Sequence, residues 1–403
     1  MRKTKMKRAL LLATLATTPL AICHAAATET APFWQDSTLK WNFRYRLEQV
    51  QPDGALADAL ASTLRSRLTV NSGQWTLAAN QSISALIEAD HVAVLGGETY
   101  NSTVNGRSRY ATIADPDGLD LNQAALLFKA GSNSLITIGR QRLNFGDQRF
   151  IGSVGWRQNE QTFDGIRLTQ QFSPTVQLDV ASLHNANRVF GPDGANADLH
   201  GRFNLAQAQW TMAADQVLQG YFYDLDFDTL SARSASTTGL DYKGGAQGFK
   251  WQAALARQHD AHAAPADYGL NYHRFELSYP LGKVTVKGIL ERLGSDGQNA
   301  FQTPFATLHA FNGFADMFLT TPAKGLREQA VQLTFPVQKA KAALSWHRFH
   351  SDVADMHYGN ELDASLAYEL NSQWQLLGKV AFYQADTLQA DTRKFWLMLT
   401  FLP

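Results

Sequence analysis

The fold is decided by stretches such as Trp41–Leu47, which reads WNFRYRL. Successive side chains of a β-strand point to opposite faces, so its four apolar residues share one face, while one asparagine and two arginines share the other. The stretches Leu64–Val70, Leu362–Glu369 and Phe395–Phe401 repeat this alternation. A strand with one apolar face and one polar face separates two different environments.

Segments with this pattern recur along the whole chain. We count 18 candidate strands, centred near residues 44, 67, 83, 124, 139, 166, 179, 207, 221, 239, 253, 274, 287, 331, 345, 365, 379 and 397. Eight short connections carry turn-forming residues, near 72–73, 131–133, 173–174, 213–215, 244–245, 280–282, 336–338 and 371–372. Longer polar connections alternate with them, among them 50–61, 91–118, 144–159, 185–201, 259–269 and 293–326.

Alternating short and long connections are typical of outer-membrane barrels, which have tight periplasmic turns and long extracellular loops. Hydrocarbon offers no partner for an unpaired backbone amide, so a membrane sheet must close on itself. We therefore predict an all-β fold, an antiparallel transmembrane β-barrel of about 18 strands with both termini in the periplasm. Aromatic residues suit girdles at the two membrane interfaces; the candidates are Trp34, Trp41, Trp210, Trp251, Trp346, Trp374, Tyr221, Tyr223, Tyr242 and Tyr368.

The first 25 residues have the pattern of a secretory signal peptide. Five basic residues lie between Arg2 and Arg8, a short apolar run extends from Ala9 to Ile22, and Cys23-His24-Ala25 ends in a small residue. We predict cleavage after Ala25, which leaves residues 26–403 as a single barrel domain, exported through the Sec pathway to the outer membrane of a Gram-negative bacterium. The alternative, lipid attachment at Cys23, would place bulky Ile22 where a small residue is expected.

The charge of the chain excludes one class of partner. Its 36 basic and 36 acidic residues balance. The leader contains five of the basic residues and none of the acidic ones, so the remainder is net acidic. A nucleic-acid partner would call for a basic surface. The partners we expect are outer-membrane lipid, the barrel-assembly machinery that inserts such proteins, and a solute.

Several motifs between residues 115 and 370 resemble the alginate export family of outer-membrane porins. The most specific are Gly139–Leu143 (GRQRL), followed by Gly146–Phe150 (GDQRF), Gly155–Asn159 (GWRQN) and Thr162–Gly165 (TFDG), and the long stretch Phe301–Asp316. His357–Asp363 and the pair of motifs at 115–118 and 121–124 are similar to the family as well. The resemblance implies an 18-stranded barrel with a basic lumen, through which an acidic polysaccharide leaves the cell.

The residues that line the lumen follow from strand parity. An arginine on the lipid face near the membrane midplane costs roughly 2–4 kcal/mol, so mid-strand basic residues should point inward. The candidates for binding substrate are Arg44, Arg46, Arg65, Arg67, Arg167, Lys250, Arg274, Lys283 and Lys287. Inward acidic partners would be Asp179, Glu276, Asp363 and Glu369, and both a net-basic and a balanced lumen remain open. Arg140 and Arg142 share the parity of Ile138, which requires either a bulge or a position beyond the bilayer.

The segment 144–164 is the candidate constriction loop. It combines charged and aromatic residues with several glycines, and could fold inward to grip a sugar or pack upon itself outside; its candidates are Asp147, Arg149, Trp156, Arg157, Asn159 and Asp164. The segment 293–326 is rich in phenylalanine, too apolar for a free loop, so we expect it to plug or cap the barrel.

Enzymatic chemistry finds little support in the sequence. It contains no Gly-x-Ser-x-Gly, no His-Glu-x-x-His and no phosphate-binding loop. His347 and His350 would lie on opposite faces of a strand, which argues against a metal site. We expect no enzyme, cofactor or metal, but a channel for passage or export of an anionic, alginate-like saccharide. The alternatives are a general small-solute porin of the same fold and, less well supported, an outer-membrane enzyme or adhesin.

Overall fold

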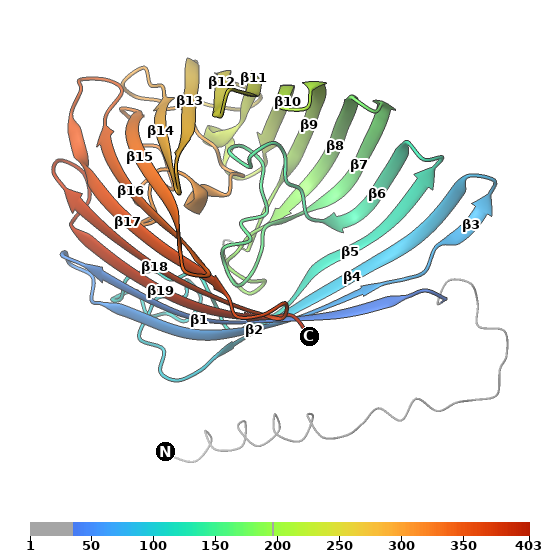
Figure 1. The fold of residues 1–403 in the computed structure, drawn as a ribbon, viewed down its shortest axis with the longest axis horizontal. Coiled ribbons are helices and arrows are strands. Elements are labelled where there is room, and N and C mark those ends of the chain that lie inside the picture. Colours follow the sequence, from blue (N-terminus) through green and yellow to red (C-terminus); the bar gives the residue numbers. More distant parts are fainter. Residues whose placement is uncertain (1–34, 196) are drawn as a thin grey trace.

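The computed structural model describes residues 35–195 and 197–403, and its strands form one curved antiparallel wall around an interior (Figure 1). The strands are β1 (Thr38–Pro52), β2 (Ala59–Asn71), β3 (Trp75–Ala78), β4 (Gln81–Val94), β5 (Gly118–Ala130), β6 (Ser134–Gln141), β7 (Thr162–Ser173), β8 (Val176–Asn187), β9 (Asp198–Ala213), β10 (Gln216–Phe227), β11 (Ala235–Ala246), β12 (Phe249–Asp260), β13 (Gly269–Leu281), β14 (Val284–Leu293), β15 (Leu326–Val337), β16 (Ala340–His350), β17 (His357–Glu369), β18 (Trp374–Ala385) and β19 (Thr392–Phe401). Two short 3₁₀ turns, η1 (Ser231–Arg233) and η2 (Leu308–Ala310), lie in long loops.

The barrel closes between its first and last strands. β1 pairs with β2 on one side and with β19 on the other, where Phe43 lies opposite Phe401 and Leu47 opposite Leu397. β3 pairs with β4 beyond the periplasmic end of β2, which pairs with the rest of β4. β2 and β3 therefore act as one interrupted strand. The wall is therefore an 18-stranded closed barrel, which confirms the predicted fold class.

Each of the 18 predicted strand centres falls inside a strand, but two predicted turns were misplaced. Ser72 and Gly73 interrupt the β2–β3 strand, and the reversal follows at Asn80, which has a positive φ of 64°. Gly244 and Gly245 lie within β11, and the turn is made by Gln247 and Gly248, both with positive φ. Such a two-residue turn suits the right-handed twist of the flanking strands, so the chain reverses there.

Alternation separates lipid from interior as predicted. Leu119, Phe172 and Leu39 are among the most exposed apolar residues, with exposures of 68%, 65% and 61%, whereas Arg46 and Glu48 are completely buried inside. The predicted signal peptide lies outside the described residues. The described residues contain no helix long and apolar enough to cross a membrane.

The polarity of the wall inverts in the external half of β10. Tyr221 and Tyr223, which we predicted for the aromatic girdles, are buried in the interior, while Asp224 and Asp226 take the outward positions. The tyrosines contact Phe150 of the loop between β6 and β7, with ring centroids 5.2 and 6.2 Å away. The assignment to the girdles was wrong because the interior at this level holds an apolar core rather than water.

That core comes from two long external loops that fold back into the barrel. The 142–161 loop joins β6 to β7, and the 294–325 loop joins β14 to β15. A bridge between Ile151 and Phe305 connects them, and the amide of Gly152 donates to the carbonyl of Phe305 at 2.8 Å. Figure 1 shows chain inside the curve of the wall at this level. The inward fold of both segments is the feature that positions the candidate site.

Candidate functional site

The 142–161 loop spans the interior and is fixed to opposite walls. On one side Arg149 donates to Glu291 of β14 at 2.7 Å. On the other side Arg44 of β1 donates to the carbonyl of Gly155 at 2.8 Å and to the Gln158 side chain at 3.0 Å. The loop therefore forms a layer across the barrel rather than a mobile flap at its mouth.

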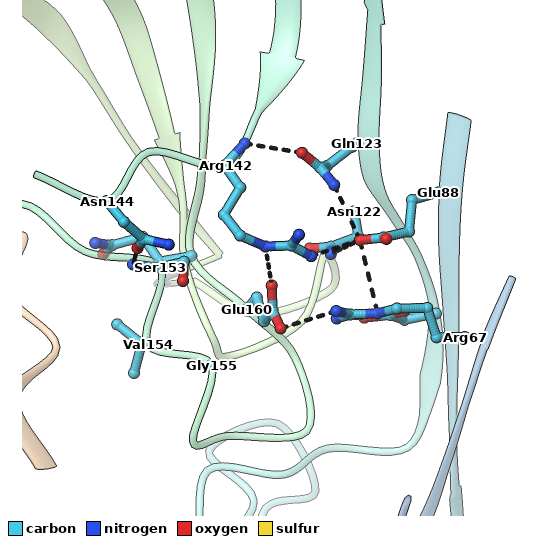
Figure 2. Close-up of polar contacts among 12 residues, drawn as sticks. Arg67, Glu88, Asn122, Gln123, Arg142, Asn144, Ser153, Val154, Gly155 and Glu160 are labelled. Atoms are coloured by element: carbon cyan, nitrogen blue, oxygen red, sulfur yellow. Dashed lines mark hydrogen bonds and ion pairs between the residues drawn. The ribbon is translucent and has the colours of Figure 1, made fainter. Parts of the chain in front are cut away.

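A network of two arginines and two glutamates joins the same loop to the β2–β5 wall (Figure 2). Arg67 of β2 donates to Glu160 at 2.8 Å, and Arg142 donates to Glu88 of β4 at 2.6 Å. Arg142 also donates to Glu160, so each glutamate accepts from more than one side chain. Although burial opposes the shift, the charges of Arg67 and Arg142 lower the pKa of Glu160 to about 2. The carboxylate is thus held in its charged form.

His309 of the 294–325 loop lies at the centre of the layer. Its ring stacks on Trp156 at 4.2 Å with an interplanar angle of 6°. Nδ1 lies 2.7 Å from Asp316, and Nε2 lies 2.7 Å from the ammonium of Lys379 on β18. Lysine has only donors, so Nε2 must accept and Nδ1–H must donate, which defines a neutral imidazole. Burial, only partly opposed by Asp316, lowers the pKa of His309 to about 3.

The tip of the 294–325 loop is held by carboxylates of β14, β15 and β17, on the side of the barrel from which the loop emerges. Asn312 donates to Glu291 at 2.6 Å and to Glu328 of β15 at 2.8 Å. The backbone amides of Phe314 and Ala315 donate to Asp363 and Glu361 of β17 at 3.0 and 2.6 Å. Buried carboxylates that accept backbone amides need partners in place, so these contacts favour the inward position of the loop.

The structure brings seven of the nine predicted lining residues into the interior. Arg44, Arg46, Arg65, Arg67 and Arg274 are buried there. Arg167 and Lys287 are partly exposed and pair with the predicted partners Asp179 and Glu276. Lys250 is exposed at the periplasmic end of β12, Lys283 lies in the turn after β13 and Glu369 is exposed at the end of β17, so these three lie away from the constriction.

Five of the six predicted loop residues lie in the inward layer, namely Asp147, Arg149, Trp156, Arg157 and Asn159. Asp164 does not, because it belongs to β7 and pairs with Arg140 on the outer wall at 2.9 Å. Arg142, which has the same parity, follows the end of β6 and turns inward with the loop. The two arginines thus lie at the external end of their strand, with one outside and one inside.

Several interior residues were missed from the sequence. Glu48 is completely buried and pairs with Arg46 at 2.7 Å and with Arg157 at 3.1 Å. It has the same strand parity as Arg44 and Arg46, a signal that parity alone could have supplied. Lys379 and His309 had no comparable signal, because their contact joins a strand and a loop that are 70 residues apart.

The interior is a mixture of charges, the second of the two possibilities left open by parity. Most interior arginines of the described chain have a carboxylate within 4.0 Å, including Arg46, Arg67, Arg149 and Arg274. Arg44 differs, since it donates to carbonyl oxygens and to Gln158. Paired charges of this kind hold the layer together and leave little free charge inside it.

Above the layer, the external loops surround a cavity of about 680 Å³, which we call the vestibule. The basic residues on its walls are Arg149, Arg157, Arg188, Arg233 and Lys394, and the only described acidic lining residue is Asp316. Arg188 and Arg233 have no carboxylate partner among the described residues. Burial and the nearby Arg233 lower the pKa of Arg188 to about 10, which leaves it charged at neutral pH. Arg149, Arg157 and Lys394 pair with Glu48, Glu291 or Asp316, so the free positive charge of the vestibule comes from Arg188 and Arg233.

Residues 35–195 and 197–403 contain no candidate metal site. No group of three histidine, cysteine, aspartate or glutamate side chains there is arranged to hold an ion. The arrangement instead offers charge, hydrogen bonds and aromatic faces to a molecule that enters the vestibule.

A closed barrel with an apolar outer face and a charged, loop-narrowed interior defines an outer-membrane channel. Residues 53–284, more than half of the chain, match the family model described as Alginate export, and the chain belongs to that family. No curated protein matches the sequence.

Solved structures with the same fold come from Pseudomonas aeruginosa and Acinetobacter baumannii. OccK9 (OpdG) of Pseudomonas aeruginosa superposes with a TM-score of 0.72 at 15% identity, over 92% of this chain and 99% of that one. OccAB4 of Acinetobacter baumannii superposes with a TM-score of 0.71 at 11% identity, over 93% of this chain and all of that one (100%). At these identities the likeness concerns the fold.

Proposed function

We propose that the barrel is a passive channel for small anionic saccharides, such as uronates. The observation that supports this is the free positive charge of the vestibule, where Arg188 and Arg233 have no carboxylate partner among the described residues. A cleft lined by one sign of charge concentrates ligands of the opposite sign. An arginine also binds a planar carboxylate through two parallel hydrogen bonds, which suits a sugar acid.

The size of the solute follows from the two inward loops. Threading of a polymer requires a continuous lumen, whereas here the 142–161 and 294–325 loops contact each other and both walls. Export of a long alginate-like chain would therefore require both loops to move out of the barrel interior together. A monosaccharide requires only local movement near Trp156 and His309, so we favour the small solute.

Solute flux into liposomes tests this proposal. We expect glucuronate to enter faster than glucose, and a trimeric uronate to be excluded. In the variant R188Q/R233Q, glucuronate flux should fall by about tenfold, because the charge that gathers it is removed, whereas glucose flux should not change. R202Q is the matched control, since Arg202 lies outside the barrel, paired with Asp226 at 2.7 Å.

The alternatives predict different results. An unselective small-solute porin would pass glucose and glucuronate equally and would be insensitive to R188Q/R233Q. A polymer-export channel would pass the trimeric uronate, or be blocked by it with high affinity. Either result would overturn the proposal.

A further inference from the structure

A groove of about 650 Å³ lies on the outer wall of the barrel, across strands β12 to β16. Its floor is apolar and includes Leu255, Phe275 and Leu290, all well exposed. Its rim is polar and basic, with His273, Arg292, Arg327, Arg348 and His350. We call it the β12–β16 groove.

The rim residues point out of the barrel at its external end. They alternate with buried interior residues, since Arg292 follows Glu291 and Arg327 precedes Glu328. β14 ends at Leu293 and β15 begins at Leu326, so each arginine lies one residue from the external end of its strand. Phe275 and Leu290 lie two residues nearer the periplasm than His273 and Arg292 on the same strands, whereas Leu255 lies opposite His273. Part of the apolar floor thus lies on the membrane side of the rim.

The charges on the rim are crowded. Arg292 lies directly opposite Arg327 across the β14–β15 pair, and His273 lies opposite Arg292 on the other side. Like charges directly opposite on one face of a sheet are destabilising. Asp352 and Asp355 neutralise two of the arginines, at Arg292 and Arg327 respectively.

The compensation is incomplete. Arg348 has no ion pair among the described residues. The Asp355 side chain is 75% exposed, and exposed pairs are worth little. An anion could therefore join or replace it at low cost, so the rim offers an unfilled site for negative charge.

A second groove, on the opposite wall, provides an internal comparison. It has about the same volume, 660 Å³, and also combines apolar residues such as Ile138 and Ile166 with two arginines. There Arg140 pairs with Asp164 at 2.9 Å and Arg202 with Asp226 at 2.7 Å. Shape alone therefore does not distinguish the two grooves, but free positive charge does.

We propose that the β12–β16 groove binds a phosphorylated acyl lipid of the outer leaflet. Its acyl chain would lie along Leu255, Phe275 and Leu290, and its phosphate would contact the arginines and histidine of the rim. Basic residues near a membrane surface attract anionic headgroups, and the rim places several of them within reach of a single phosphate. The apolar floor makes a lipid, rather than a free phosphate, the occupant that uses the whole groove.

Native mass spectrometry of the detergent-solubilised full chain, titrated with bis-phosphorylated lipid A, tests the proposal. We expect one lipid to remain bound, with the same lipid lacking both phosphates binding at least about tenfold more weakly. The variant R292Q/R327Q/R348Q should lose affinity by a similar factor, whereas R202Q, in the other groove, should bind as the wild type does. Circular dichroism and ion conductance report whether each variant retains the barrel.

If the triple variant fails to fold, the single variant R348Q can be tested instead. Arg348 has no ion pair among the described residues, so its replacement breaks none. Equal binding of the phosphorylated and dephosphorylated lipids would overturn the proposal, as would unchanged affinity in the folded variants. A lipid-independent dimer that the same variants abolish would show that a second copy of the chain occupies the groove, and would also overturn it.

Discussion

Arg149 of the 142–161 loop donates to Glu291 of β14 at 2.7 Å, and both side chains are buried. The same carboxylate accepts from Asn312 of the 294–325 loop at 2.6 Å and lies 3.0 Å from Arg274 of β13. One glutamate therefore holds both inward loops to the wall. Because the two loops fill the interior, this contact connects the stability of the loops to the width of the passage.

Replacement of Glu291 should release the loops. In E291Q, Arg149 and Arg274 lose their shared carboxylate, and removal of one partner from a buried pair costs about 3–5 kcal/mol. We expect single-channel conductance to rise at least about twofold, because the two loops move out of the barrel interior. R393Q is the control, since its pair with Asp53 spans 3.8 Å and both side chains are exposed. Unchanged conductance in folded E291Q would mean that the loops are held by other contacts.

Shortening the 294–325 loop should widen the channel more strongly. Replacement of residues 299–320 by a short glycine-serine linker removes η2, His309 and Asn312, but leaves β14 and β15 intact. The long-loop side of a barrel tolerates such changes, because closure depends on strand pairing. We expect a several-fold rise in conductance and entry of the trimeric uronate in the liposome assay. A folded variant with wild-type conductance would show that the loop does not limit flow.

Acidification should weaken the packing of His309 in the barrel interior. Its pKa is about 3 in the folded chain, below the ordinary value of 6.5, because burial favours the neutral form. When the loop is displaced or unfolded, His309 takes up a proton as the pH falls below 6.5. When the loop is packed in the interior, His309 stays neutral until about pH 3. The stability of the packed loop is therefore lost progressively between these two pH values. Glu160 contributes to the loss only below about pH 4.5, its ordinary value.

The window between pH 6.5 and 4.5 therefore isolates the histidine from Glu160. We expect conductance to rise and the midpoint of thermal unfolding to fall across this window in the wild type. In H309Q, which keeps a polar side chain without a titratable group, both should be nearly constant. A pH dependence that persists unchanged in H309Q would assign the effect to another group.

The wall of the barrel was predictable because it obeys a local rule. Each strand alternates in polarity, and turn residues mark where it reverses, so all 18 centres were correct. The errors have local causes too. Gly244 and Gly245 resemble a turn but continue β11, because Gly244 allows Trp251 of the neighbouring strand to lie across it.

The interior was less predictable, because its contacts join distant parts of the chain. Strand parity predicts that Arg44 points inward. It does not predict the acceptors of Arg44, because the carbonyl of Gly155 and the side chain of Gln158 lie more than 110 residues away in the sequence. Tyr221 and Tyr223 were misassigned because an apolar plug changes the environment that the inner face meets. Alternation indicates which residues face inward, but it does not indicate what fills the interior.

The reversal potential of the reconstituted wild-type channel in a potassium chloride gradient tests the central claim most directly. The vestibule, in which Arg188 and Arg233 have no carboxylate partner among the described residues, predicts preference for chloride, and the preference should decrease in R188Q/R233Q. A potential at zero, or one of the sign that denotes potassium preference, would contradict the account.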